Sequence, residues 1–135
     1  MNKEQFWEEF NQAAEAIGSD LRITEMTEEG GITAFNTSEN TVSLLFGAEA
    51  KEEITIIAKM TELGAARGIE AFCLAVDALG PGDPKWRNGL LHRLHLMDGK
   101  VAMRNKTQTE ARGYVFSFER KVFAKDLFSM RIRKA

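Results

Sequence analysis

The chain has little of three things: it has one cysteine, two prolines and no apolar run that reaches the length of a membrane span. A lone cysteine, Cys73, cannot close an internal disulfide, which favours a reducing cytoplasm. The first residues also lack the basic start and apolar core of a signal peptide. Because of these two features we expect a cytoplasmic protein. Proline is scarce and low-complexity tracts are absent, so we also expect a single folded domain over residues 1–135.

Motifs for catalysis and nucleotide binding are lacking too. Gly30-Gly31 and Gly80-Pro81-Gly82 have neither the glycine spacing nor the lysine of a phosphate-binding loop, so we interpret both as turns. Carboxylates are numerous, but the sequence does not place any two of them as an acid and a base. We therefore expect no cofactor and favour a non-catalytic protein, with a small enzyme as a separate class of function.

The charge is distributed unevenly along the chain. From Met1 to Gly64 there are 4 basic and 13 acidic residues, a balance of −9, whereas Ala65 to Ala135 carries 14 basic and 7 acidic residues, a balance of +7. The net charge of −2 hides this difference. Such an asymmetry indicates an interaction surface, an oppositely charged partner or self-association.

The first half of the chain predicts a helix followed by antiparallel strands. Asn2 can cap the helix, and Gly18 can end it. Its apolar residues recur three or four positions apart: Phe6, Trp7, Phe10, Ala13, Ala14 and Ile17. Four strands separated by turn residues are expected at Leu21–Thr27, Gly31–Thr37, Thr41–Phe46 and Glu53–Met60.

The second half begins with the clearest helix, Ala65–Leu79. Its apolar stripe consists of Ala65, Ile69, Phe72, Cys73, Val76 and Leu79. After it we expect a short helix at Pro84–Asn88 and a hairpin around Asp98-Gly99, although a continuous helix over Lys85–Met97 is the alternative. The two arms of that hairpin are expected at Leu91–Met97 and Lys100–Asn105. A strand at Gly113–Lys121 and a short terminal helix at Lys125–Lys134 are expected to follow.

This order of elements predicts an α+β fold. An N-terminal helix precedes an antiparallel sheet, a middle helix packs on that sheet, and a C-terminal hairpin region and a short terminal helix follow. No internal repeat and no βαβ alternation is evident, which argues against a nucleotide-binding α/β domain.

Two histidines are the candidates for a metal site and, together with Trp86, for a pocket. His92 and His95 would share a face on a helix but would point to opposite faces on a strand. No third ligand is identified, so we predict no metal site, and Trp86, His92 and His95 are the residues that could line a pocket. Cys73 lies in an apolar helical stripe, which is typical of a core residue rather than a nucleophile.

The basic second half supplies a candidate nucleic-acid surface. The segment from Arg112 to Phe118 shares a basic-glycine-aromatic opening with the RNA-binding strand of an RRM domain, but it departs from that pattern at Val115, Ser117 and Glu119. Alternating aromatic residues on a strand also suit a core face. The residues of this candidate surface are Lys100, Arg104, Arg112, Tyr114, Arg120 and Lys121.

In its order of elements alone, the chain resembles the class I chaperones of bacterial type III secretion. That resemblance implies a dimeric, non-catalytic protein that binds extended segments of a partner, although the basic C-terminal region is a departure from it. We therefore predict a cytoplasmic polypeptide-binding or adaptor protein, chaperone-like and homodimeric, that acts through an apolar sheet or helix face. The alternative is a nucleic-acid-binding protein that uses the basic C-terminal hairpin.

Overall fold

The computed structural model describes residues 2–47, 53–80, 84–96, 105–120 and 126–135. Within them the chain forms an α+β fold, as the sequence predicted. Its elements are α1 (Lys3–Ala16), β1 (Ile23–Glu29), β2 (Ile32–Thr37), β3 (Val42–Phe46), β4 (Ile54–Lys59), α2 (Glu62–Leu79), α3 (Pro84–Arg93), β5 (Lys106–Ala111), β6 (Tyr114–Arg120) and β7 (Leu127–Lys134).

The strands form one antiparallel, seven-stranded sheet with the order β1-β2-β3-β4-β7-β6-β5. Strands β1 to β4 follow one another as a meander, and β5 to β7 form a second one. The two meanders meet where β4 pairs with β7, with Ile56 opposite Met130. The acidic half of the sequence therefore builds one end of the sheet, and the basic half builds the other.

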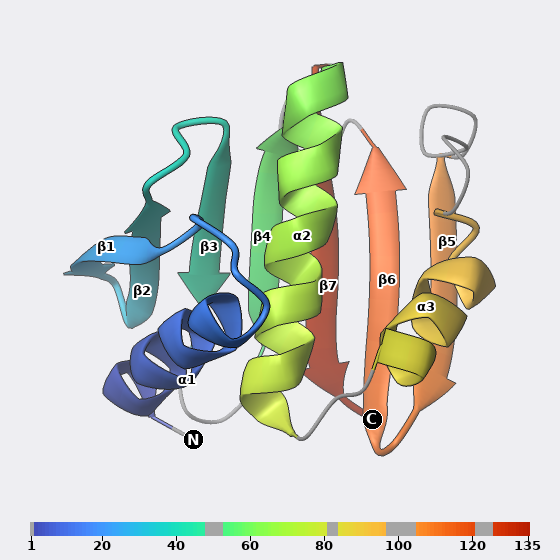
Figure 1. The fold of residues 1–135 in the computed structure, drawn as a ribbon, viewed down its shortest axis with the longest axis horizontal. Coiled ribbons are helices and arrows are strands. Elements are labelled where there is room, and N and C mark those ends of the chain that lie inside the picture. Colours follow the sequence, from blue (N-terminus) through green and yellow to red (C-terminus); the bar gives the residue numbers. More distant parts are fainter. Residues whose placement is uncertain (1, 48–52, 81–83, 97–104, 121–125) are drawn as a thin grey trace.

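The three helices in the described residues lie on the same side of the sheet, with α2 over its middle and α1 and α3 toward its two ends (Figure 1). On the inner strands, most of the residues that face them are apolar. A row of directly paired residues shows this: Phe35, Leu44, Ile56, Met130 and Phe118 cross the five inner strands, and all are fully buried. Burial of this face against the helices forms the hydrophobic core.

Helix α1 has the ends that its sequence predicted. The Asn2 side chain accepts a hydrogen bond of 2.7 Å from the backbone N–H of Gln5, as a capping residue does. Gly18 adopts a left-handed conformation with φ of 73°, and Ser19 N–H donates to the carbonyl of Ala14. Phe6, Phe10 and Ala14 are buried as expected, but Ile17 at the end of the stripe is 49% exposed.

Two hairpins use two-residue turns with positive φ angles. Gly30 and Gly31 join β1 to β2, with φ angles of 58° and 81°. Arg112 and Gly113 join β5 to β6 with nearly the same geometry, at 54° and 81°. Such turns match the twist of the strands that they connect. The C-terminal hairpin is thus formed around Arg112-Gly113, and the Asp98-Gly99 turn predicted for it lies outside the described residues.

Helix α2 begins one turn earlier than predicted and is more deeply buried. Thr61 caps it by accepting a 3.0 Å hydrogen bond from Gly64 N–H. Its fully buried positions are mostly small, and the predicted stripe residues Ala65, Ile69, Cys73 and Leu79 are only partly buried. Small residues are needed because α2 contacts both the sheet and α1.

Helix α3 corrects the prediction of a short helix at Pro84–Asn88. It runs through Gly89 to Arg93, so the first residues of the expected strand Leu91–Met97 are helical. The helix ends where Leu96 N–H donates to the carbonyl of Leu91 and His95 N–H donates to the carbonyl of His92. The other arm, Lys100–Asn105, lies outside the described residues except for Asn105, which is not in a strand.

The predicted terminal helix at Lys125–Lys134 is wrong. The tail forms strand β7, in which Phe128, Met130 and Ile132 alternate with Ser129 and Arg131 and are buried against the helices. It completes the sheet because β4 and β6 both pair with it. Among the described residues, no helix is both long enough and apolar enough to span a membrane.

Candidate functional site

The structure joins two predicted sites that the sequence treated separately. Arg112, from the nucleic-acid candidates, places its guanidinium carbon 3.9 Å from the ring centroid of Trp86, from the pocket candidates. A cation over the face of an indole ring is attracted by the ring electrons. This contact connects the β5–β6 turn to α3 and occupies one face of each side chain.

Tyr114 belongs to the same group of aromatic residues. Its ring centroid lies 6.1 Å from that of Phe116, and Phe116 is also 6.2 Å from Trp86 and 6.1 Å from Phe72. Tyr114 is half-buried on the face of the sheet that carries the helices. Its packing is that of a core face, since it lies beside Phe116 in the cluster.

The other nucleic-acid candidates are spread over the basic end of the sheet. Arg120 pairs with Phe128 across β6 and β7 and is half-buried. Lys100, Arg104 and Lys121 lie outside the described residues. The nucleic-acid surface therefore stays a prediction, because half of its residues fall outside the described ranges.

The two histidines of the candidate pocket are exposed near the end of α3. His95 has a positive φ of 58°, which takes it off the helical path that His92 still follows. In the described part of the chain, no three His, Cys, Asp or Glu side chains are grouped to hold a metal ion. The hydrogen bond between the two residues runs from His95 N–H to the His92 carbonyl, so it uses backbone groups and neither imidazole.

Cys73 lies on α2 near an ion pair that links α2 to α3. Burial raises the pKa of its thiol to about 12, so the thiolate needed for nucleophilic attack is disfavoured. Arg87 of α3 donates to the carboxylate of Asp77, and both side chains are largely buried. Burial raises the pKa of Asp77, while Arg87 opposes this shift. The pair joins the two helices over the basic end of the core.

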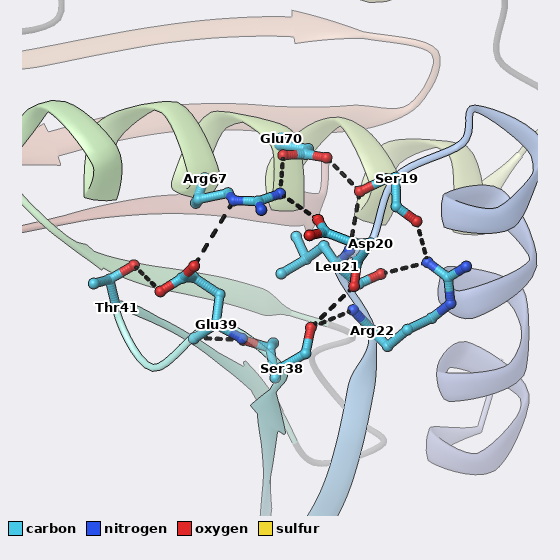
Figure 2. A network of polar contacts seen from close by, with 10 residues as sticks. Ser19, Asp20, Leu21, Arg22, Ser38, Glu39, Thr41, Arg67 and Glu70 are labelled. Atoms are coloured by element: carbon cyan, nitrogen blue, oxygen red, sulfur yellow. Dashed lines mark hydrogen bonds and ion pairs between the residues drawn. The ribbon is translucent and has the colours of Figure 1, made fainter.

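A second polar cluster surrounds Arg67 of α2 at the acidic end (Figure 2). Its guanidinium lies 2.8 Å from Asp20, 3.0 Å from Glu70 and 3.8 Å from Glu39. These carboxylates come from the α1–β1 connection, from α2 itself and from the β2–β3 turn. The hydrogen bond and charge of Arg67 lower the pKa of Asp20, and the carboxylates in turn raise the pKa of Arg67.

Further hydrogen bonds, most of them between side chains and the backbone, extend the Arg67 cluster. Ser19 donates its hydroxyl proton to Glu70 and accepts a hydrogen bond from Leu21 N–H. Arg22 donates to the carbonyls of Ser19 and Leu21, and its N–H donates to Ser38 Oγ. The cluster therefore holds three separate segments of chain in one place, which is a structural role.

The face of the sheet opposite the helices is covered by none of the described helices (Figure 1). A row of seven directly paired residues crosses all strands on this face. From β1 to β5 they are Glu25, Asn36, Ser43, Ile57, Ser129, Glu119 and Lys106. We call these residues the central row. It has a carboxylate at one end, an ammonium group at the other and Ile57 on the middle strand.

The next row on the same face is shifted by two residues along each strand. It consists of Thr27, Ala34, Leu45, Thr55, Arg131, Ser117 and Gln108, and we call it the second row. Leu45 and Ile57 are half-buried, and Ile32 beyond them on β2 is 48% exposed. These side chains form a short apolar stripe over β2 to β4 in a largely polar face, which also carries Val115 on β6 and Leu127 on β7.

The sequence predicted an apolar sheet or helix face, and on this face the apolar surface is limited. Among the described residues, the exposed large hydrophobic side chains are Ile17, Ile32 and Leu63, and of these Ile32 is on the sheet. Two polar atoms on the helix-free face, Ser129 Oγ and Arg131 Nε, are buried without a hydrogen-bond partner among the described residues. An unpaired buried polar atom is costly, so such atoms often mark sites of interaction or strain.

The two edges of the sheet are protected from pairing with another strand in different ways. The Asn11 side chain of α1 donates to the carbonyl of Ile23 and accepts from its N–H, at 3.0 and 2.8 Å. It thereby satisfies backbone groups at the outer edge of β1 that another strand would otherwise bind. At the opposite edge, β5 carries the exposed residues Lys106, Gln108 and Glu110, whose polarity also discourages pairing with another strand.

Neither the helix-free face nor the Arg67 cluster is evident from the sequence alone. Both depend on strand register and on segments that are distant in sequence, which no local pattern reveals. In comparisons with known proteins, the chain matches no protein-family model, no curated protein and no solved structure. A proposal about its function must therefore rest on its own surfaces.

Proposed function

We propose that this chain is a non-catalytic, cytoplasmic polypeptide-binding or adaptor protein that contacts its partner through the helix-free face of its sheet. The observation that carries the proposal is that this wide face lacks a covering helix in the described residues yet carries an apolar stripe, in which Leu45 and Ile57 are half-buried and Ile32 is exposed. Protein interfaces typically combine apolar side chains with surrounding polar ones, and this face carries both.

Two further observations favour binding over catalysis. The thiol of Cys73 has a raised pKa, and the described histidines are exposed at a helix end and belong to no metal-binding group in the described residues. The titratable groups with shifted pKa values belong to ion pairs or to the core, where they hold elements together. The resemblance to secretion chaperones supports the proposal only in its general form, since the last element is a strand and not a helix.

A photo-crosslinking residue at Ser43, exposed at the middle of the helix-free face, tests this proposal in cells. The control carries the same residue at Glu8, which is exposed on α1 on the other side of the molecule. We expect Ser43 to form cross-links to a discrete polypeptide, identified by mass spectrometry, that Glu8 does not form.

The captured polypeptide is then purified and titrated against the wild type and Leu45→Lys, which places a charge in the apolar stripe. Weaker binding by Leu45→Lys, with an unchanged circular dichroism spectrum, is the expected result. The proposal fails if Ser43 captures nothing that Glu8 does not also capture. It also fails if the purified protein carries only nucleic acid that salt removes, because the basic hairpin would then be the leading site.

A further inference from the structure

The charge asymmetry of the sequence becomes a direction in the folded chain. Strands β1 to β4 of the acidic half and strands β5 to β7 of the basic half occupy opposite ends of one sheet. The polarity therefore runs along the sheet, perpendicular to its strands. It does not run from the helix-covered face to the helix-free face.

This direction discriminates between two ways of stacking a second copy on the helix-free face. A two-fold axis perpendicular to the strands, in the plane between the sheets, would put each end over the same end of the other copy, so that like charges meet. An axis parallel to the strands would put the acidic end of each copy over the basic end of the other. Closed two-fold dimers are the commonest homo-oligomers, and opposite charges favour the second arrangement.

We propose that the helix-free face binds a second copy of this chain through a two-fold axis parallel to β4, the middle strand. This inference rests on the proposed function, since it names the polypeptide that occupies the face. It makes Ile57 the centre of the interface, because Ile57 lies on the fourth of seven strands in the central row.

The central row is self-complementary about that axis. Ile57 meets Ile57 of the second copy, and Ser43 lies over Ser129, a small side chain that is only 1% exposed and adds little contact of its own. In the outer pairs, Asn36 of one copy faces Glu119 of the other, which brings an amide to a carboxylate. Glu25 faces Lys106, which brings a carboxylate to an ammonium group. Each of these pairings is favourable or neutral, so one continuous row of the sheet fits a reversed copy of itself.

The second row fits in the same way. Near the axis Thr55 lies over Thr55, and both are largely buried within their own sheets, while Leu45 meets the aliphatic stem of Arg131. In the row beyond, Ile32 meets Val115, whereas Glu29 and Glu110 bring like charges together at the corners of the sheet, where solvent and salt screen them. Glu53 comes near its own copy close to the axis, but it is already 3.8 Å from Arg131 of its own chain.

The face is large enough for such an interface. Strands about 4.8 Å apart, with about six residues each, give a seven-stranded face of roughly 600 Å², close to the approximately 800 Å² that each partner buries in a typical complex. Aligned packing of two sheets on their side chains is a common architecture. The dimer would be a four-layered body with the helices outside.

The pair Glu25 and Lys106 supplies the test, because both side chains are exposed and their exchange leaves the core untouched. The dimerisation constants of the wild type, Glu25→Lys, Lys106→Glu and the double variant are measured by sedimentation equilibrium at low salt. Each single variant places two pairs of like charges in the dimer, and we expect dimerisation to weaken by about tenfold. The double variant restores both attractions and should dimerise like the wild type.

Mixing the two single variants is the sharpest measurement. The ammonium group introduced by Glu25→Lys then faces the carboxylate introduced by Lys106→Glu, and the unchanged Glu25 and Lys106 face each other. A mixed dimer should therefore form more tightly than either homodimer. The controls Glu8→Lys and Lys85→Glu make the same charge changes at exposed positions of α1 and α3. They should leave dimerisation of the protein unchanged.

Three results would overturn the inference: a monomeric wild type at high micromolar concentration, a dimer insensitive to either single variant, or a mixture that associates no better than its components. A monomer whose Ser43 position still captures another polypeptide would overturn the second copy as occupant and leave the proposed function intact. A dimer that is insensitive to these variants and to Leu45→Lys would overturn the assignment of the interface to this face.

Discussion

Gly68 of α2 lies so close to Phe128 of β7 that a Cβ atom built on the glycine would be 2.7 Å from the Cζ atom of the ring. The same Cβ atom would be 2.7 Å from the Cβ of Ala58 on β4. Helix α2 therefore crosses the junction of the two meanders at a distance that only glycine allows. This contact sets how near the central helix lies to the sheet.

Gly68→Ala should destabilise the protein because the added methyl group must displace α2 or the Phe128 ring. Overpacking of this kind typically costs about 1–3 kcal/mol, which would appear as a lower midpoint in urea or thermal unfolding. The matched control is Gly89→Ala in α3, since nothing lies within 4 Å of a Cβ at that position.

Gly89→Ala should stabilise the protein by about 0.5–1 kcal/mol, the usual gain from replacing glycine inside a helix. Opposite signs for the two substitutions are the expected outcome. If Gly68→Ala were neutral or stabilising, the close approach of α2 to the sheet would be contradicted.

The Arg67 cluster predicts a dependence of stability on pH. Because Arg67 lowers the pKa of Asp20 in the folded state, ionised Asp20 contributes stability above its unfolded pKa of about 3.9, and this contribution is lost as the pH falls through the lower folded pKa. Arg67→Met should therefore lower the stability at pH 7 and flatten the decline in stability below about pH 4. Unfolding in urea from acidic to neutral pH measures both effects.

Arg93→Met is the control for the loss of one positive charge, because Arg93 is exposed on α3, at the other end of the sheet. It should leave the shape of the pH profile as in the wild type. An Arg67→Met profile parallel to that of the wild type in the acidic range would show that Arg67 and Asp20 are not coupled.

The sequence predicted the fold class and most elements because their signals are local. The alternation of Tyr114, Phe116 and Phe118 identified β6 and its buried face, and the Asn2 cap identified the start of α1. Strand β7 was missed because Leu127, Phe128 and Ile132 were given a helical spacing, although Phe128, Met130 and Ile132 also alternate as a strand requires. The extent of α3 was missed because Gly89 weakens a helix, yet this exposed glycine is tolerated.

The candidate site could not be predicted in the same way. The central row consists of one residue from each of seven strands, and its members become neighbours only through the register of six strand pairs. Glu25 and Lys106 are far apart in the sequence and mark opposite ends of the same row. The charge asymmetry indicated an interaction surface, but its direction across the sheet required the strand order.

His95 gives a prediction that separates a structural role from a functional one. It has a φ of 58° at the end of α3, a conformation in which a non-glycine residue is strained. His95→Gly should therefore stabilise the protein by up to about 1 kcal/mol. His92→Gly, inside the last helical turn, should destabilise it by a similar amount, and thermal unfolding of the two variants measures both. Destabilisation by His95→Gly would indicate that the imidazole makes a contact that the helix end does not explain.

The ion pair between Asp77 and Arg87 should behave as a coupled unit. Asp77 Oδ1 is buried without a hydrogen-bond partner in the described part of the chain, so the pair is only partly satisfied. Either single substitution, Asp77→Leu or Arg87→Leu, leaves a poorly solvated charge without its partner and should cost about 2–3 kcal/mol. The double variant removes both charges and should cost much less than the sum of the single variants. Urea unfolding of all four proteins completes this cycle, and costs that simply add would show that the two side chains stabilise α2 and α3 independently.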